Sequence, residues 1–272
     1  MSESVATHYS GGGDLAAKIA AGLRQAGKDP AALTTADLAA VDEFHFRGRA
    51  ATLDLAAQMG LRADKRVLDI GSGLGGPART LAETYGCHVT GLDLTAAFCE
   101  AAAVLSGWVG LDALTDFRQG DATAMPFAAA EFDAAISLHV GMNIAAKDAL
   151  YREARRVLKP GGVFAVYDIL QGEGGAVPYP VPWARTASIS HLATPEAMAA
   201  LLSEAGFEIL AREDSSEESL AWLEARTRQK AAGPLPVTTQ LLFGDDFALM
   251  TRNQLQALAE KRMRTVSFIC AA

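Results

Sequence analysis

The segment VLDIGSGLGG, residues 67–76, begins with an apolar run that contains Asp69. Four glycines in six positions follow that run. A glycine loop between a strand and a helix lets a ligand approach the backbone closely. The loop satisfies the pattern G-x-G-x-x-G, and Asp93 follows about 20 residues later. Two cofactors fit: a dinucleotide, with its pyrophosphate at the helix N-terminus, and S-adenosylmethionine (SAM), which has no phosphate. Gly71, Ser72 and Gly73 are the predicted contacts of this loop.

Asp69 and Asp121 favour SAM over a dinucleotide. Asp69 lies at the carboxyl end of the first predicted strand, where a carboxylate would repel pyrophosphate but suits an ammonium group. In GDATAMPF, residues 120–127, Asp121 can accept a hydrogen bond from an adenine amine, and Ala122 offers a backbone N–H. Either aspartate could instead bond its own turn. An NAD-dependent oxidoreductase explains the glycines and Asp93 but not Asp121, and it remains the alternative.

A histidine and two neighbours follow the fourth predicted strand. The segment SLHVGMN places His139, Met142 and Asn143 after an apolar run. Open α/β sheets bind ligands at the carboxyl ends of their strands, so we expect these residues to line the pocket. His139 is a candidate proton acceptor, although a lone histidine here could equally be structural.

Three aromatic side chains come from distant segments. Tyr9, His45 and Trp183 could be ordinary cap or core residues. Aromatic rings around a sulfonium ion gain from cation–π attraction and exclude water. The three are therefore predicted pocket residues, and Tyr9 is a second candidate to accept a proton.

Alternating elements must position these residues. Strands are predicted at 66–70, 87–92, 115–119, 132–138, 162–169, 207–213 and 264–271. Helical patterns lie between most of them, which predicts a Rossmann-like, doubly wound, mostly parallel α/β sheet with helices on both faces.

The remaining segments are assigned to a cap and a lid. Residues 1–60 show helical patterns at 14–26 and 47–59 and predict a small helical cap. Residues 61–272 form the cofactor-binding domain, with lid and substrate segments at 170–194 and 214–263. Ser215 with Glu218 predicts a capping box at a helix start.

Composition narrows the class of protein. The chain has 272 residues and a net charge of −8. An acidic chain of this kind lacks the excess of basic residues that is typical of nucleic-acid binders. No apolar run reaches the ~18 residues of a membrane span. Three scattered cysteines and five dispersed histidines suggest no disulfide framework and no metal site. The N-terminal residues lack the pattern of a signal peptide, and a cytoplasmic location is expected.

The motifs together resemble those of class I SAM-dependent methyltransferases. The resemblance rests on five segments in order: VLDIGSGLGG, GLDL, GDATAMPF, FDAAISLHVGMNI and RVLKPGGVFAVYD. It implies that Asp93 binds both ribose hydroxyls, that Leu94 packs on the adenine, and that Leu138 and His139 lie under the methionine end. The segments VDEFHFRGRAATLDLA and PYPVPWA look similar to small-molecule enzymes of the sarcosine/dimethylglycine N-methyltransferase kind.

The resemblance implies a reaction as well as a fold. We expect in-line methyl transfer from SAM, with S-adenosylhomocysteine as product, to a small acceptor such as an amine or another heteroatom nucleophile. Neither a nucleic acid nor a membrane is expected as partner, and a homodimer is left open. A non-catalytic SAM-binding module and cyclopropane formation on lipid remain alternatives.

Overall fold

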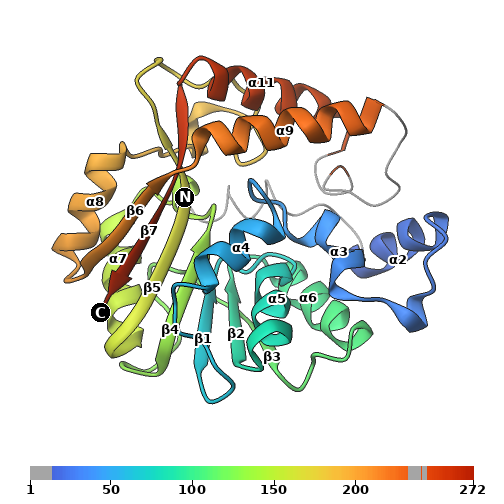
Figure 1. The fold of residues 1–272 in the computed structure, drawn as a ribbon, viewed down its shortest axis with the longest axis horizontal. Helices are drawn as coiled ribbons and strands as arrows, with labels where there is room; N and C mark the ends of the chain where they lie inside the picture. Colours follow the sequence, from blue (N-terminus) through green and yellow to red (C-terminus); the bar gives the residue numbers. More distant parts are fainter. Residues whose placement is uncertain (1–13, 232–239, 241–243) are drawn as a thin grey trace.

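A seven-stranded sheet forms the centre of the computed structural model, which describes residues 14–231, 240 and 244–272 (Figure 1). The strand order is β3-β2-β1-β4-β5-β7-β6, and β7 pairs antiparallel with both neighbours while the other pairs are parallel. This confirms the predicted mostly parallel, Rossmann-like sheet. The strands are β1 (Arg66–Ile70), β2 (His88–Asp93), β3 (Thr115–Gln119), β4 (Phe132–Leu138), β5 (Leu158–Gln171), β6 (Glu208–Asp214) and β7 (Met263–Ala271).

Helices cover both faces of the sheet (Figure 1). They are α2 (Leu15–Gln25), α3 (Thr35–Asp42), α4 (Arg49–Ala56), α5 (Gly76–Tyr85), α6 (Ala96–Trp108), α7 (Lys147–Val157), α8 (Pro195–Glu204), α9 (Ser216–Ala231) and α11 (Phe247–Ala259). Short 3-10 turns are η1 (Pro30–Ala32), η2 (Gly141–Asn143), η3 (Ala187–Ile189) and η4 (Gly244–Asp246). None of the helices described is both long and apolar enough to cross a membrane.

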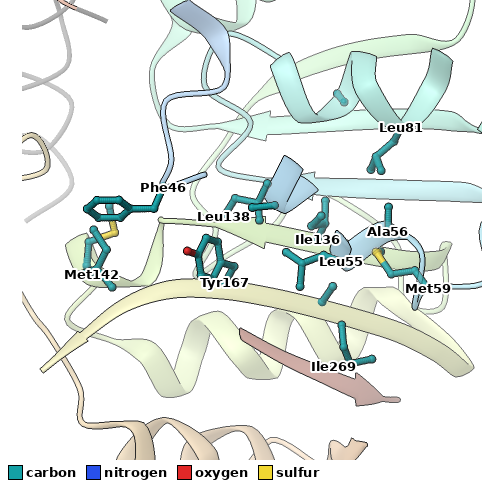
Figure 2. Packing of buried hydrophobic residues seen from close by; sticks show 14 of the residues in the cluster. Phe46, Leu55, Ala56, Met59, Leu81, Ile136, Leu138, Met142, Tyr167 and Ile269 are labelled. Carbon is teal, nitrogen blue, oxygen red and sulfur yellow. The ribbon is translucent and has the colours of Figure 1, made fainter. Parts of the chain in front are cut away.

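Alternation along the buried strands supplies two cores, because successive side chains point to opposite faces. Val67 joins α4, α5 and α11 on one face, whereas Leu68 joins α7 and α8 on the other. Figure 2 shows Leu55 of α4 in the first cluster together with Ile136 of β4 and Ile269 of β7. The continuous apolar runs of the sequence reflect this burial on both faces.

The N-terminal segment contains one helix that the apolar spacing does not predict. In α3 the apolar residues do not gather on one side, so the periodicity is weak. Its start is nevertheless encoded locally, because Asp37 Oδ2 accepts from both Thr34 N at 2.9 Å and Thr34 Oγ1 at 2.7 Å. Helix α4 begins only after Arg47 and Gly48, which both have positive φ, and is shorter than the predicted 47–59.

Two local predictions are wrong. Strand β5 begins at Leu158, not at residue 162, because Leu158 already pairs with Phe132 of β4. An irregularity in the pairing follows, where Gly161 has a left-handed conformation. The capping box of Ser215 and Glu218 does not form. The Ser215 hydroxyl instead donates to Tyr167 Oη at 3.2 Å inside the core.

Candidate functional site

A cavity of about 400 Å³ lies at the carboxyl ends of β1, β2 and β4, where the order of the strands reverses. Its wall contains every predicted site residue that the structure describes, whereas Tyr9 lies outside the described residues. These lining residues are His45, Asp69, Gly71, Ser72, Gly73, Asp93, Leu94, Asp121, Ala122, Leu138, His139, Met142, Asn143 and Trp183.

The glycine loop is tied directly to Asp93. Asp93 Oδ2 accepts a hydrogen bond from Gly73 N, and Asp93 Oδ1 accepts one from Thr95 N, both at 2.8 Å. Gly71 has φ +75°, and a Cβ built there would lie 2.3 Å from a methyl of Val140. Only glycine fits this backbone, so the loop presents bare peptide groups to the cavity.

Asp69 is a buried acid with an unsatisfied oxygen. Its side chain is 1% exposed, and Oδ2 has no hydrogen-bond partner within the described part of the chain. Burial, reinforced by the charges of Glu43 and Asp93, raises the pKa of Asp69 to about 8. The nearby Ser72 Oγ is also buried without a partner there. These atoms suit a ligand that brings a cation and hydrogen-bonding groups.

One carboxylate oxygen of Asp121 accepts hydrogen bonds within its own turn. Its Oδ1 accepts from Thr123 N at 2.8 Å and from Thr123 Oγ1 at 2.7 Å. The turn holds the carboxylate at the cavity rim beside Ala122, with Oδ2 as the second acceptor. The turn and the adenine interpretations are therefore compatible.

His139 is held in an unusual backbone conformation. Its φ is +54°, and its N–H donates to Tyr167 O at 2.8 Å. The ring packs against Tyr167, Phe46 and His45, with centroids 4.9, 5.5 and 5.9 Å away. Burial, then the neighbouring His45, lowers the pKa of His139 well below its ordinary value. Its Nε2 is buried and has no partner in the described regions, so a neutral imidazole can accept a bond from a ligand.

His45 is a structural histidine of the cavity wall. Its Nε2 lies 3.0 Å from Gly48 O, which makes it the protonated nitrogen, and 3.2 Å from Thr52 Oγ1. Thr52 in turn donates to Glu43 Oε2 at 2.7 Å. Burial lowers the pKa of His45 to about 4, so the ring is neutral at pH 7.

Replacing Thr52 with valine should lower the free energy of unfolding by about 1–3 kcal/mol, because the buried Glu43 carboxylate loses a donor. Denaturant unfolding measures this change. Thr227→Val on α9 is the control, since that residue is exposed and should change stability by less than about 0.5 kcal/mol. Equal effects of the two substitutions would contradict the importance of this network.

Asn143 and Trp183 organise a loop over the cavity. Asn143 Nδ2 donates to Trp183 O at 2.7 Å and to Ile189 O at 3.0 Å. Trp183 is 1% exposed, and its Nε1 donates to Ser190 Oγ at 3.0 Å. The amide of Asn143 therefore positions the loop.

Other lining residues have no distinctive sequence signal. Phe44 comes from the segment between α3 and α4 and approaches Gly73, and Gln254 comes from α11. The buried Arg79 of α5 pairs with Asp42 of α3 at 2.7 Å and so fixes the two helices to each other. Across residues 14–231, 240 and 244–272, no cluster of His, Cys, Asp and Glu could hold a metal ion.

The family described as a methyltransferase domain matches residues 68–166. This range includes most of β1, all of β2, β3 and β4, and most of β5. Residues 68–166 of the chain thus form a methyltransferase domain. A sterol 24-C-methyltransferase of Gibberella zeae is 40% identical over 116 residues, which cover 43% of this chain and 30% of that relative. One of Eremothecium gossypii is 33% identical over 183 residues, covering 60% and 45% of the two chains. The chain thus spans less than half the length of these curated relatives.

Solved structures share the architecture of the methyltransferase domain. Phosphoethanolamine N-methyltransferase 2 of Haemonchus contortus, in complex with SAM, superposes with a TM-score of 0.73 at 23% identity, over 85% of this chain and 54% of that one. The cyclase SpnF superposes with a TM-score of 0.66 at 24% identity, over 93% and 92%. At these identities the likeness shows the fold alone.

Proposed function

We propose that the cavity binds SAM. Asp69 takes the ammonium group, Asp93 the ribose hydroxyls and Asp121 the adenine amine, while the glycine loop leaves room for the ligand. The supporting observation is Asp69 Oδ2, a buried carboxylate oxygen without a partner among the described residues, in the same cavity as the other two aspartates. A positively charged ligand offsets the desolvation of such a group, whereas a pyrophosphate would add to the repulsion.

The proposed activity is methyl transfer to a small molecule. When bound, SAM supplies a methyl group on a sulfonium that leaves readily. The domain's own residues align the acceptor and exclude water, which can contribute ~7–11 kcal/mol to lowering the barrier. His139 Nε2 takes the proton that the acceptor loses, since the ring is neutral and its Nε2 is buried without a described partner.

A proton acceptor in the site is compatible with methyl transfer to either nitrogen or carbon. An amine acceptor must arrive neutral or lose a proton, and an acceptor that reacts at carbon must also lose one after transfer. The curated relatives are named as C-methyltransferases, whereas the motif resemblance favours a heteroatom. His139 would serve either class. The loop around Trp183 and the helices α9 and α11 would then form the substrate side of the pocket. The cytoplasmic location and the oligomeric state remain predictions.

Two measurements test the proposal. Calorimetry should detect binding of SAM and S-adenosylhomocysteine, and an absence of binding at millimolar concentration would reject it. Methyl-labelled SAM should then transfer label to a member of a panel of small amines, phenols and carboxylates. The alternative that the sequence leaves open is a SAM-binding module that transfers no methyl group. Binding without label transfer to any acceptor would support that alternative, and fluorescence enhancement of added NADH would support the oxidoreductase alternative.

Replacing Asp93 with asparagine should weaken S-adenosylhomocysteine binding by about tenfold to hundredfold. Asparagine has one acceptor oxygen, so it cannot both hold Gly73 N and Thr95 N and bind ribose. Titration calorimetry gives the dissociation constants, and Asp112→Asn is the control because Asp112 is exposed and outside the cavity. An unchanged affinity of the Asp93 variant would show that the ribose lies elsewhere.

A further inference from the structure

A smaller cavity of about 60 Å³ adjoins the proposed cofactor site. It shares Phe44, His45, His139, Pro182 and Gln254 with the larger one. The rest of its wall is mostly apolar and includes Phe46, Trp222, Leu223 and Phe247. It therefore extends the site beyond His139, on the side covered by α9.

Arg226 is the cation in the wall of this smaller cavity. Its guanidinium lies over the Trp222 ring, 4.9 Å from the centroid. The next arginine on the helix, Arg228, pairs with Glu224 at 3.5 Å, whereas no ion pair joins Arg226 to an acid of the described segments. Burial alone lowers the pKa of Arg226, and no carboxylate opposes that shift.

The acid in the wall of this cavity does not serve as the counterion. Glu43 lines the cavity, but its two oxygens accept from Thr52 at 2.7 Å and Thr80 at 2.5 Å. Burial is the largest cause of its raised pKa, and the arginines that lower that pKa are Arg49 and Arg79, not Arg226. Among the described residues, the Trp222 ring therefore offsets part of the desolvation of the Arg226 guanidinium, but no carboxylate pairs with it.

We propose that Arg226 binds a carboxylate or phosphate of the methyl acceptor, whose apolar body lies against Trp222 and Phe46. This inference rests on the proposed function. A guanidinium binds either anion through two parallel hydrogen bonds, and stacking on an aromatic ring fixes its plane. An acceptor without an anionic group would leave a desolvated cation unpaired, so Arg226 would select against neutral acceptors.

The test titrates hexanoate, hexyl phosphate and hexan-1-ol into the protein saturated with S-adenosylhomocysteine. Arg226→Met should weaken binding of at least one anion by about tenfold or more and leave hexan-1-ol unchanged. Arg226→Lys should restore part of the loss, since it keeps the charge but not the planar fork. Arg228→Met is the matched control and should bind all three as the wild type does. Whichever anion binds tighter identifies the acceptor group as carboxylate or phosphate.

The outcomes separate this inference from the proposed function. Binding of S-adenosylhomocysteine is measured first, and its failure would overturn both. If it binds but neither anion binds, or if Arg226→Met binds the anions as tightly as the wild type, only the role of Arg226 is overturned. An affinity of Arg226→Met for S-adenosylhomocysteine within about twofold of the wild type shows that the variant is folded.

Discussion

Replacing Asp69 with asparagine is expected to weaken S-adenosylhomocysteine binding by about 10²- to 10³-fold. The carboxylate is 1% exposed, and its Oδ2 has no hydrogen-bond partner in the described structure, so a bound ammonium would pair with it directly. Removing one member of a buried charge pair leaves the other desolvated and uncompensated. Calorimetry measures the loss, and Asp112→Asn again serves as the exposed control. A loss below about fivefold would place the ammonium elsewhere.

The same residue should make ligand binding release a proton. In the free protein the pKa of Asp69 is about 8, so the carboxyl is mostly protonated at pH 6.5. A bound ammonium stabilises the ionised form and lowers this pKa, and the ligand's own amine is already protonated at that pH. Binding should therefore release close to one proton. The observed enthalpy should vary with the ionisation enthalpy of the buffer for the wild type and not for Asp69→Asn.

The raised pKa of Asp69 should also make the free protein less stable as the pH rises. An unfolded aspartate ionises near pH 3.8, whereas folded Asp69 stays protonated until about pH 8. The unfolded state therefore binds fewer protons between these values, and the contribution of Asp69 to stability falls as the pH rises through this range. The bound ligand, by favouring the carboxylate, removes this loss.

Replacing His139 with glutamine should lower kcat by about 10²- to 10⁴-fold, the usual contribution of a positioned base. Glutamine keeps a polar side chain of similar length but cannot take up a proton. Affinity for S-adenosylhomocysteine should change little, which separates proton transfer from cofactor binding. The pKa of His139 lies well below its ordinary value, so this ring should remain a base when the pH falls from 8 to 6.

The control for this variant is His88→Gln, since His88 lies on β2 outside the cavity, beside Asp116. It should retain the wild-type kcat. A His139→Gln enzyme with kcat within about threefold of the wild type would show that water, or a residue outside the described segments, accepts the proton.

The sequence predicts the cofactor side of the cavity because each residue there belongs to a local motif. Asp69, Asp93 and Asp121 lie at or just beyond strand ends, and the order of parallel strands brings those ends to one edge. The positions of the strands could also be predicted from the sequence, because continuous apolar runs predict buried strands.

The substrate side could not be predicted in the same way. Arg226 lies in the segment LEARTRQK, and nothing in that sequence distinguishes it from Arg228. The difference appears only in the structure, where Arg226 packs against Trp222. Phe44 and Gln254 reach the cavity through tertiary contacts between segments far apart in the chain. The role of Asn143 as a tether depends on the carbonyls of Trp183 and Ile189, which no local pattern reveals.

The position of β7 constrains how the protein can be synthesised. This strand lies between β5 and β6, yet residues 263–271 follow every other strand of the sheet in the chain. While a nascent chain emerges from the ribosome, β5 and β6 therefore each present an unpaired edge that could join another polypeptide. The sheet can close only when these late residues insert between two strands already made, so the exposed edges remain open to aggregation until this domain has been translated.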